Sequence, residues 1–207
     1  GNIQSAPKSG ANIFADCTSS GVDLLPNFNY QTALFDSRSW AGPAGVGILV
    51  IKSSATWRNP LPHNDLNRTP NTYSLPLLLA SAVALENYLS QTDIRSKLKN
   101  EIISFIKEQI TDVDIASSAN GLGKFLSLSI KGVEADRLLL DLEDQGFAVE
   151  SGSACKSADM KPSHVLAAMG KPITGNIRLT IHKEITSEIV KDFCQALKTS
   201  VSKLRSN

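Results

Sequence analysis

Long apolar runs are missing from this sequence. Nowhere among the 207 residues do about eighteen or more apolar residues follow one another, and a helix that crosses a membrane needs about 20. The first ten residues, GNIQSAPKSG, also lack the basic and then apolar order of a secretory signal peptide. We therefore expect a cytoplasmic protein that is neither embedded in a membrane nor secreted.

Cysteine and histidine are few and scattered. The sequence contains Cys17, Cys155 and Cys194, and His63, His164 and His182. No two cysteines form a Cys-x-x-Cys pair and no histidine spacing suits zinc, so the sequence predicts neither a metal site nor a disulfide framework. Because three cysteines cannot all pair with one another, at least one thiol is free.

An excess of charge of either sign is also lacking. The 21 lysines and arginines are balanced by 20 aspartates and glutamates, which gives a net charge of +1. Basic residues are not interleaved with aromatic ones, as they are on many nucleic-acid-binding surfaces. From this composition we expect no nucleic-acid partner and no membrane partner, so function has to be inferred from local motifs.

What the sequence does contain is a succession of short strands and helices. In the first third, three apolar runs that end in turn residues predict neighbouring strands of a buried sheet. They lie within 11–21, 32–39 and 45–52. A polar stretch with three prolines, 53–74, follows and is a candidate active-site loop. The pattern is helical from Leu75 to about Ile110, and Pro76 fits the first turn, where a backbone N–H is not needed.

Alternating strand and helix patterns in the second half predict a compact α/β domain. Residues 124–130 alternate leucine and isoleucine with serine, which is the period of a strand with one buried face. A helix over 133–146 follows, with its leucines on one face and Gly146 at its C-cap. The apolar residues 147–149 predict the next strand, which runs into the segment around Cys155.

Three more elements complete this half. A short helix over 162–169 precedes an alternating strand over 176–181, and a last helix begins at about Thr186. The last helix has one apolar stripe, formed by Ile189, Phe193, Leu197, Val201 and Leu204. A stripe of this kind predicts that the helix packs on the sheet through that face.

Cys155 stands in the segment VESGSACKSADM, among glycine, serine and alanine rather than among apolar residues. Buried cysteine usually packs like a small hydrophobic residue, so this setting is unusual for a core thiol. Flexible flanks would let a thiolate reach a bound electrophile, whereas the alternative is an unreactive loop cysteine. For Cys17 and Cys194 we expect core packing or a half-buried helix face.

Two charged residues and one glycine-rich turn also have two interpretations each. Asp16 closes a strand at the end where α/β sheets gather their ligands, or it caps a turn. Arg178 faces away from its apolar neighbours on the strand, where it either binds a ligand or is solvated. The turn GPAGVG lacks the lysine of a phosphate-binding P-loop, so a simple turn into a strand is favoured.

In their order, these pieces resemble the second half of a cysteine desulfurase, a member of the class V aminotransferase family with the pyridoxal-phosphate (PLP) fold type I. SGSACKSADMKPSHVLAAMG resembles that family's catalytic-cysteine loop and the helix after it, and NIRLTIHKEITSEIV resembles the strand and helix that follow. Upstream, IFADCTSSG resembles the strand with the cofactor aspartate, and AGPAGVGILVIK resembles the strand entered after the PLP lysine. YSLPLLLASAVAL resembles a helix start of the family, so the resemblance covers nearly the whole chain.

The resemblance implies roles for three matching residues. Asp16 would contact the pyridine nitrogen of PLP and keep it protonated, so that the ring acts as an electron sink. Arg178 would hold the carboxylate of the cysteine substrate with its two-pronged donor geometry. Cys155 would attack the sulfur of the PLP-bound cysteine, which would release alanine and leave a persulfide on the protein.

Other positions depart from the family pattern. Ser39 stands where the resemblance places the lysine that binds PLP, and serine has no amine for that bond. Arg38 replaces a histidine, and Asp36 replaces a serine that faces the cofactor phosphate. An acid there should repel the phosphate unless Arg38 compensates. Ser19 takes the place of a glutamine that contacts the cofactor ring.

The remaining departures concern the polar loop and the N-terminus. Asn71 replaces an arginine of the family pattern, and Arg68 is the arginine that remains upstream of it. Residues 1–4 resemble those just after an Asn-Glu motif of the family, so we expect the family's N-terminal half to be absent from this sequence. Because Ser39 replaces the lysine, covalent PLP binding is not expected, and the sheet edge left exposed by the missing half predicts a homodimer or a partner chain.

The predicted fold is α/β: part of a large PLP-fold domain over 1–95, ending in a helix, and a small C-terminal domain over 96–207. The predicted function is that of a cysteine desulfurase-like protein, impaired in PLP chemistry as this chain alone. Its implied small molecule is cysteine, and its implied partner is a sulfur-acceptor protein, as in iron–sulfur cluster assembly. The alternative is a non-catalytic relative that acts as a persulfide carrier or interaction module. The candidate site residues are Cys155 for catalysis, Asp16, Ser19, Arg38 and Ser39 for the cofactor, and Arg178 for the substrate.

Overall fold

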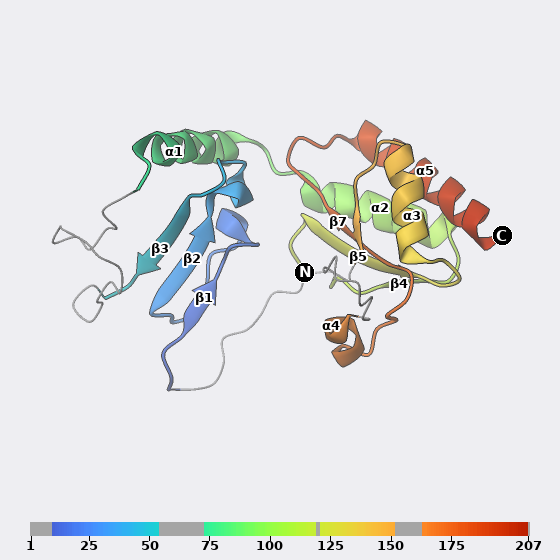
Figure 1. Cartoon of the computed structure of the whole chain (residues 1–207), viewed down its shortest axis with the longest axis horizontal. Coiled ribbons are helices and arrows are strands. Elements are labelled where there is room, and N and C mark those ends of the chain that lie inside the picture. The colour runs from blue at the N-terminus through green and yellow to red at the C-terminus, as the bar shows by residue number, and fades with distance from the viewer. Residues whose placement is uncertain (1–9, 54–72, 119–120, 152–162, 207) are drawn as a thin grey trace. The chain divides into compact units, whose positions relative to one another are not determined.

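The computed structural model describes residues 10–53, 73–118, 121–151 and 163–206. The chain divides into two compact units, which meet in the sequence between Thr92 and Asp93. Figure 1 shows strands and helices in both, so the predicted α/β class is confirmed. The sequence placed the division at 95/96, and the assignment of the first unit to a large PLP-fold domain stays a prediction.

The first unit contains a three-stranded sheet in the order β1-β2-β3. Its strands are β1 (Phe14–Asp16), β2 (Thr32–Asp36) and β3 (Gly47–Ile51). β1 is parallel to β2, and β3 is antiparallel to β2. The predicted neighbouring strands are thus confirmed. Because β1 and β2 run in the same direction, Asp16 and Asp36 end their strands at the same edge of the sheet.

Two 3₁₀ turns and one long helix complete the first unit. The turns are η1 (Gly21–Asp23) and η2 (Ser37–Trp40), and the helix is α1 (Leu75–Ser90) with a proline in its first turn, as predicted. The buried Trp40 indole donates a hydrogen bond from Nε1 to the Ser81 carbonyl at 3.2 Å. The Tyr88 hydroxyl donates to the Asp23 carboxylate at 2.7 Å. These two contacts fix α1 to the turns beside the sheet.

Burial in the first unit is less complete than the sequence predicted. Ala33 and Phe35 of β2 are buried, but Leu49 and Val50 of β3 are more than a third exposed. The helix α1 also carries large apolar side chains that are exposed. They are Leu75, Leu77, Leu78, Leu79, Val83 and Leu89. The prediction of a buried sheet was therefore wrong for β3.

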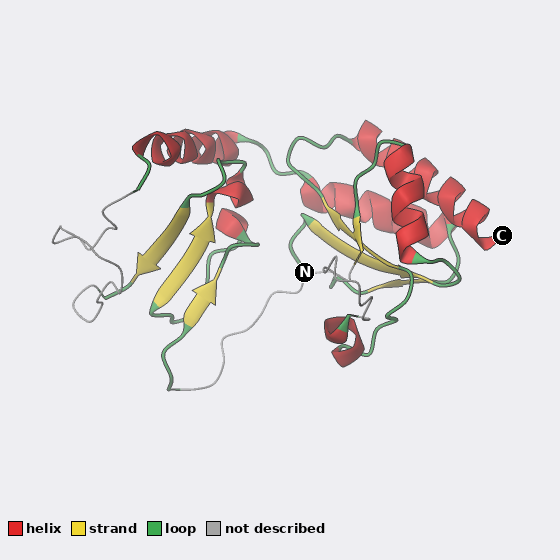
Figure 2. Cartoon of the chain, in the orientation of Figure 1, coloured by secondary structure: helices red, strands yellow, loops and turns green. Residues whose placement is uncertain are grey.

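The second unit contains an antiparallel sheet in the order β4-β5-β7-β6. Its strands are β4 (Val113–Ile115), β5 (Phe125–Ile130), β6 (Glu150–Ser151) and β7 (Asn176–Thr180). Its helices are α2 (Arg95–Gln109), α3 (Ala135–Asp144), α4 (His164–Ala168) and α5 (Ser187–Arg205). α2, α3 and α5 cover one face of the sheet (Figure 2).

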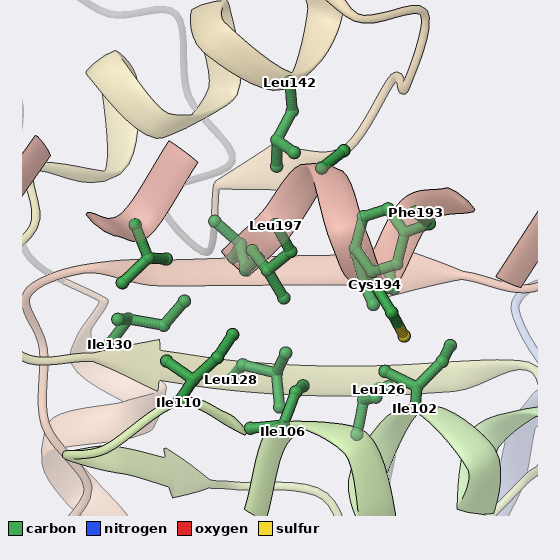
Figure 3. Close-up of a cluster of buried hydrophobic side chains, with 14 of the residues drawn as sticks. Ile102, Ile106, Ile110, Leu126, Leu128, Ile130, Leu142, Phe193, Cys194 and Leu197 are labelled. Atoms are coloured by element: carbon green, nitrogen blue, oxygen red, sulfur yellow. The ribbon is translucent and has the colours of Figure 1, made fainter. Parts of the chain in front are cut away.

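The core of the second unit lies between that face and the three helices (Figure 3). Leu126, Leu128 and Ile130 of β5 are fully buried, as the alternation with serine predicted. Ile177 of β7 and Leu142 of α3 are also fully buried. Ser129 is buried too, because the chain after α4 covers the opposite face of the sheet at that point and its Pro172 carbonyl accepts the serine hydroxyl at 3.0 Å.

Two details of the second unit differ from the sequence prediction. The strand expected at 147–149 begins only at Glu150, and Phe147 and Val149 pack against the core from a loop. Ile189, expected in the apolar stripe of α5, is 41 % exposed, and Val190 takes the buried position instead. Gly146 follows α3 with a φ of +87°, as a C-cap glycine should. Within the described parts of the chain, no helix is both long and apolar enough to cross a membrane.

Candidate functional site

Asp16 ends β1 at the edge of the first sheet. Its Oδ1 accepts hydrogen bonds from the Thr18 amide at 3.0 Å and the Thr18 hydroxyl at 2.7 Å. These bonds lower the pKa of the exposed carboxyl group below its usual value, so it is ionised at neutral pH. The structure therefore shows the turn-capping role that the sequence left as one alternative. An ionised, exposed carboxylate also suits a protonated ring nitrogen.

Asp36 and Arg38 form an ion pair at the end of the neighbouring strand. Arg38 donates from Nη2 and Nε to Asp36 Oδ2 at 2.6 and 3.0 Å, and its amide donates to Oδ1 at 2.9 Å. The hydrogen bonds from Arg38 lower the pKa of Asp36. The sequence left open whether Arg38 compensates the negative charge of Asp36. In the structure the guanidinium of Arg38 neutralises that charge. The same bonds leave Arg38 with a carboxylate already bound.

Ser39 lies in η2 with its hydroxyl turned back to the main chain. Its Oγ donates to the Asp36 carbonyl at 2.7 Å. Gly21 of η1 has a φ of +57°, and a β-carbon added to it would lie 2.7 Å from the Ser39 β-carbon. The two turns therefore meet at this point, with glycine allowing the close approach. No amine is present at residue 39, so the residues here do not fit a covalently held PLP. Ser19 is exposed in the turn between β1 and η1.

Arg178 lies on the face of the second sheet that α2, α3 and α5 leave uncovered. Its neighbours Ile177 and Leu179 are buried in the core, so its side chain points the other way, as predicted. The antiparallel register places Ser127 of β5 on one side of it and Glu150 of β6 on the other. Arg178 donates from both Nε and Nη2 to Glu150 Oε2, the Nε bond being 3.0 Å long.

The polar face around Arg178 includes residues that the sequence analysis did not single out. The buried Asn176 donates from Nδ2 to the Leu128 carbonyl at 2.9 Å and to the Ser127 hydroxyl at 3.2 Å. Glu150 was passed over because the strand was expected to end before it. The signal was present in the sequence: a lone acid directly after an apolar run and before the glycine-serine segment.

A hollow of about 670 Å³ opens beside Arg178. It lies between residues 146–150 and 178–182, where the chain before β6 does not pair with β7. Most of its lining is apolar and includes Phe147 and Phe193, and Arg178 is among the polar residues that line it.

Cys155 lies outside the described residues, as do Arg68 and Asn71. It follows the end of β6 at Ser151 by four positions in the sequence. The other two cysteines are free thiols in the two cores, as predicted. Burial raises the pKa of the Cys194 thiol to about 11 and also raises that of Cys17. Neither of them is therefore a candidate nucleophile.

Metal chemistry finds no support in the described ranges. No group of three or more histidine, cysteine, aspartate or glutamate side chains is close enough there to hold an ion. The site residues divide between the two units: Asp16, Ser19, Arg38 and Ser39 lie in the first, and Arg178 lies in the second.

The chain is similar in sequence to curated cysteine desulfurases, although no family model matches it. It is 30 % identical over 196 residues to the cysteine desulfurase IscS of Dictyoglomus turgidum and 29 % identical over 197 residues to that of Clostridium botulinum. Each alignment covers 89 % of this chain but 48 % and 50 % of the relative. The chain thus spans about half the length of the curated relatives that it matches.

Solved structures show the same likeness in fold. A NifS-like protein superposes with a TM-score of 0.69 at 23 % identity, over 84 % of this chain and 47 % of that one. The apo cysteine desulfurase of Thermococcus onnurineus NA1 superposes with a TM-score of 0.74 at 19 % identity, over 94 % and 53 %. The predicted resemblance to cysteine desulfurases is confirmed, and the fold corresponds to about half of theirs.

Proposed function

We propose that this cysteine desulfurase-like chain works in sulfur transfer, with Cys155 as the residue that carries the sulfur. The observation that supports it best is the register of β6 on β7. Glu150 pairs with Arg178, and Ser151 pairs with Ile177, so β6 ends one residue beyond the Arg178 pair. Four residues of chain reach at most about 14 Å. The thiol-bearing segment therefore begins two residues after Glu150, the residue opposite the arginine that the resemblance assigns to the substrate carboxylate.

The proposed step is a transfer of sulfur between two thiols. The Cys155 thiolate attacks the terminal sulfur of a donor persulfide and forms a new S–S bond to it. The S–S bond of the donor breaks, and its electron pair leaves with the donor sulfur as a thiolate, which takes up a proton. The reaction converts one persulfide and one thiol into another persulfide and thiol, so it needs no external oxidant or reductant.

We propose that sulfur arrives as a persulfide because the residues of this chain do not fit covalent PLP. PLP supplies the electron sink through which cysteine can give up its sulfur. At residue 39 a serine hydroxyl is bonded to the main chain, and Arg38 already holds Asp36. In this proposal the chain receives sulfur from a donor and passes it to an acceptor protein.

The second candidate function is PLP-dependent cysteine desulfuration with a cofactor that is held without a covalent bond. One observation favours it: the Asp16 carboxylate is ionised, exposed and located at the carboxyl end of a parallel strand pair. In this candidate Asp16 would keep the ring nitrogen protonated.

We further propose a cytoplasmic location and a homodimer or a partner chain. The support for a protein partner is the exposed apolar side of α1, because contiguous apolar patches on a protein surface usually mark contact sites. A sulfur-acceptor protein is the other partner that this function requires.

The test of the proposal is to load the purified chain with sulfur from a small persulfide, such as glutathione persulfide, and to locate the added atom by mass spectrometry. The expected result is one extra sulfur atom on the peptide that contains Cys155. Cys155→Ser should abolish the gain, and Cys194→Ser, which removes a buried thiol, should leave it unchanged. Absence of loading, or equal loading of Cys155→Ser, would contradict the proposal.

A further inference from the structure

Arg178 is already bound to a carboxylate within its own chain. Its Nε and Nη2 both donate to a single oxygen of Glu150, Oε2. The pair lies on the sheet face that the three long helices leave uncovered, and it is among the residues that line the 670 Å³ hollow. A ligand carboxylate that binds Arg178 must therefore displace the Glu150 carboxylate from the guanidinium.

The position of Glu150 follows from the strand register. Residues directly opposite one another in an antiparallel pair present their side chains on the same face, close enough for opposite charges to meet. Glu150 is opposite Arg178, and Ser127 flanks Arg178 from the other side. The hydroxyl of Ser127 carries no charge, so Glu150 is the group in this register that neutralises the guanidinium.

The contact with Glu150 is one that a ligand can displace. The side chains of Arg178 and Glu150 are 44 % and 62 % exposed, so water and small solutes reach both. Exposed ion pairs of this kind are weak. Glu150 also uses one oxygen for both donors, whereas a free carboxylate can approach an arginine with two oxygens in parallel, which is the stronger geometry.

We infer that Glu150 occupies the carboxylate subsite at Arg178 and competes there with the carboxylate of an incoming ligand. The inference deepens the proposed function and rests on its assignment of Arg178 as the ligand anchor. Glu150 lowers the affinity of the site for free amino acids, because each must displace it and overcome its charge. A sulfur donor whose cysteine is part of a polypeptide has no free carboxylate beside its sulfur and does not meet this competition. The site therefore favours protein-bound persulfide over free cysteine derivatives.

The competition can be measured by titrating the labelled chain with L-alanine and with ethylamine, which is alanine without its carboxylate. Chemical shifts of the backbone amides of Arg178 and Ser127 report binding. Glu150→Gln keeps the shape of the side chain and removes its charge. Glu134→Gln is the matched control, because it removes an acid from a comparable exposed ion pair, with Arg137 on α3.

We expect Glu150→Gln to reach half-saturation with L-alanine at about two- to fivefold lower concentration than the unaltered chain, as the strength of exposed ion pairs implies. Glu134→Gln should reach half-saturation at the same L-alanine concentration as the unaltered chain. Ethylamine should not shift the amide signals of the unaltered chain or of either variant. Equal titration of Glu150→Gln and the unaltered chain, absence of L-alanine binding in both, or an equal response to ethylamine would overturn the inference.

The two proposals fail in different experiments. If Cys155 takes up sulfur but Glu150→Gln titrates like the unaltered chain, the inference about Glu150 is wrong and the sulfur-transfer function stands. If Glu150→Gln binds L-alanine more tightly but Cys155 takes up no sulfur, Glu150 does mask Arg178 and the sulfur-transfer function is wrong.

Discussion

The two units of this chain differ in how completely each buries its apolar residues. In the second unit, nineteen described residues form one buried cluster between an antiparallel sheet and three helices. In the first unit the corresponding cluster has six residues, and α1 exposes most of its leucines. A parallel strand pair normally needs cover on both faces, whereas an antiparallel sheet tolerates one open face. The second unit thus buries its large apolar residues in one core, whereas the first leaves many of its own exposed.

The largest effect should come from the same substitution made once in each unit. Leu128→Ala empties a fully buried position in the second core, and we expect it to reduce the free energy of unfolding by about 2–5 kcal/mol. Leu79→Ala removes a side chain of α1 that is 59 % exposed, and its effect should stay within about 0.5 kcal/mol. Urea unfolding followed by circular dichroism measures both. An equal loss for Leu79→Ala would show that Leu79 is covered in solution.

A pair of glycines tests how tightly the first unit is packed at its candidate site. Gly21 and Gly45 both have positive φ, but an added β-carbon meets Ser39 at Gly21 and open space at Gly45. Both substitutions by alanine strain the backbone, and Gly21→Ala adds a clash. We expect Gly21→Ala to destabilise the chain by about 1–3 kcal/mol more than Gly45→Ala does. Thermal unfolding of the two variants decides this, and equal melting temperatures would contradict the close contact of η1 and η2.

The two buried thiols report how readily each core opens. Cys17 belongs to the small cluster and Cys194 to the large one. In a Cys155→Ser background, at pH 8, we expect iodoacetamide to modify Cys194 at least about tenfold more slowly than Cys17. The reasons are that the larger core opens less often and that burial raises the Cys194 pKa to about 11. In concentrated urea the two rates should become equal. Faster modification of Cys194 in the folded chain would reverse the comparison.

The smallest effect concerns an ion pair at the start of the second unit. Arg95 holds the pKa of Asp93 at about 2, below its ordinary value of 3.8. A lowered carboxyl pKa adds stability above about pH 4, and that stability is lost as the pH falls towards 2. Because the Asp93 side chain is 46 % exposed, we expect less than about 1 kcal/mol.

The measurement for this pair is the unfolding free energy of Asp93→Asn between pH 2 and 7. The variant should be slightly less stable than the unaltered chain at pH 7, and only a small part of the difference should remain at pH 2. Glu108→Gln removes a carboxylate from the exposed side of α2 and is the control. A difference that persists unchanged down to pH 2 would contradict the assigned pKa.

Local patterns in the sequence predicted the elements that local forces decide. The alternation of leucine and serine in 124–130 predicted the buried face of β5, and Gly146 predicted the end of α3. The orientation of Arg178 away from the core followed from the alternation in β7. For β5 and β7 the period of the side chains along the strand carries the information, and for α3 the glycine at its end does.

Contacts between elements could not be predicted in the same way. The pairing of Glu150 with Arg178 depends on the register of β6 on β7, which joins residues 28 positions apart. The pairing of Asp36 with Arg38 was open to prediction, because the residues are two positions apart, but its geometry was not. The exposure of Leu49 and Ile189 depends on which other elements pack against them. The apolar character of a residue in a strand or helix does not reveal those neighbours.

In the proposed function, this chain carries sulfur on Cys155 without releasing it from cysteine through PLP. The most direct measurement is alanine formation by the purified chain incubated with PLP and L-cysteine, with Cys155→Ser beside it. We expect no alanine above the level formed with free PLP, while the same preparation takes up sulfur from glutathione persulfide on Cys155. Alanine formation that disappears in Cys155→Ser would contradict it and would show that PLP chemistry proceeds with serine at residue 39.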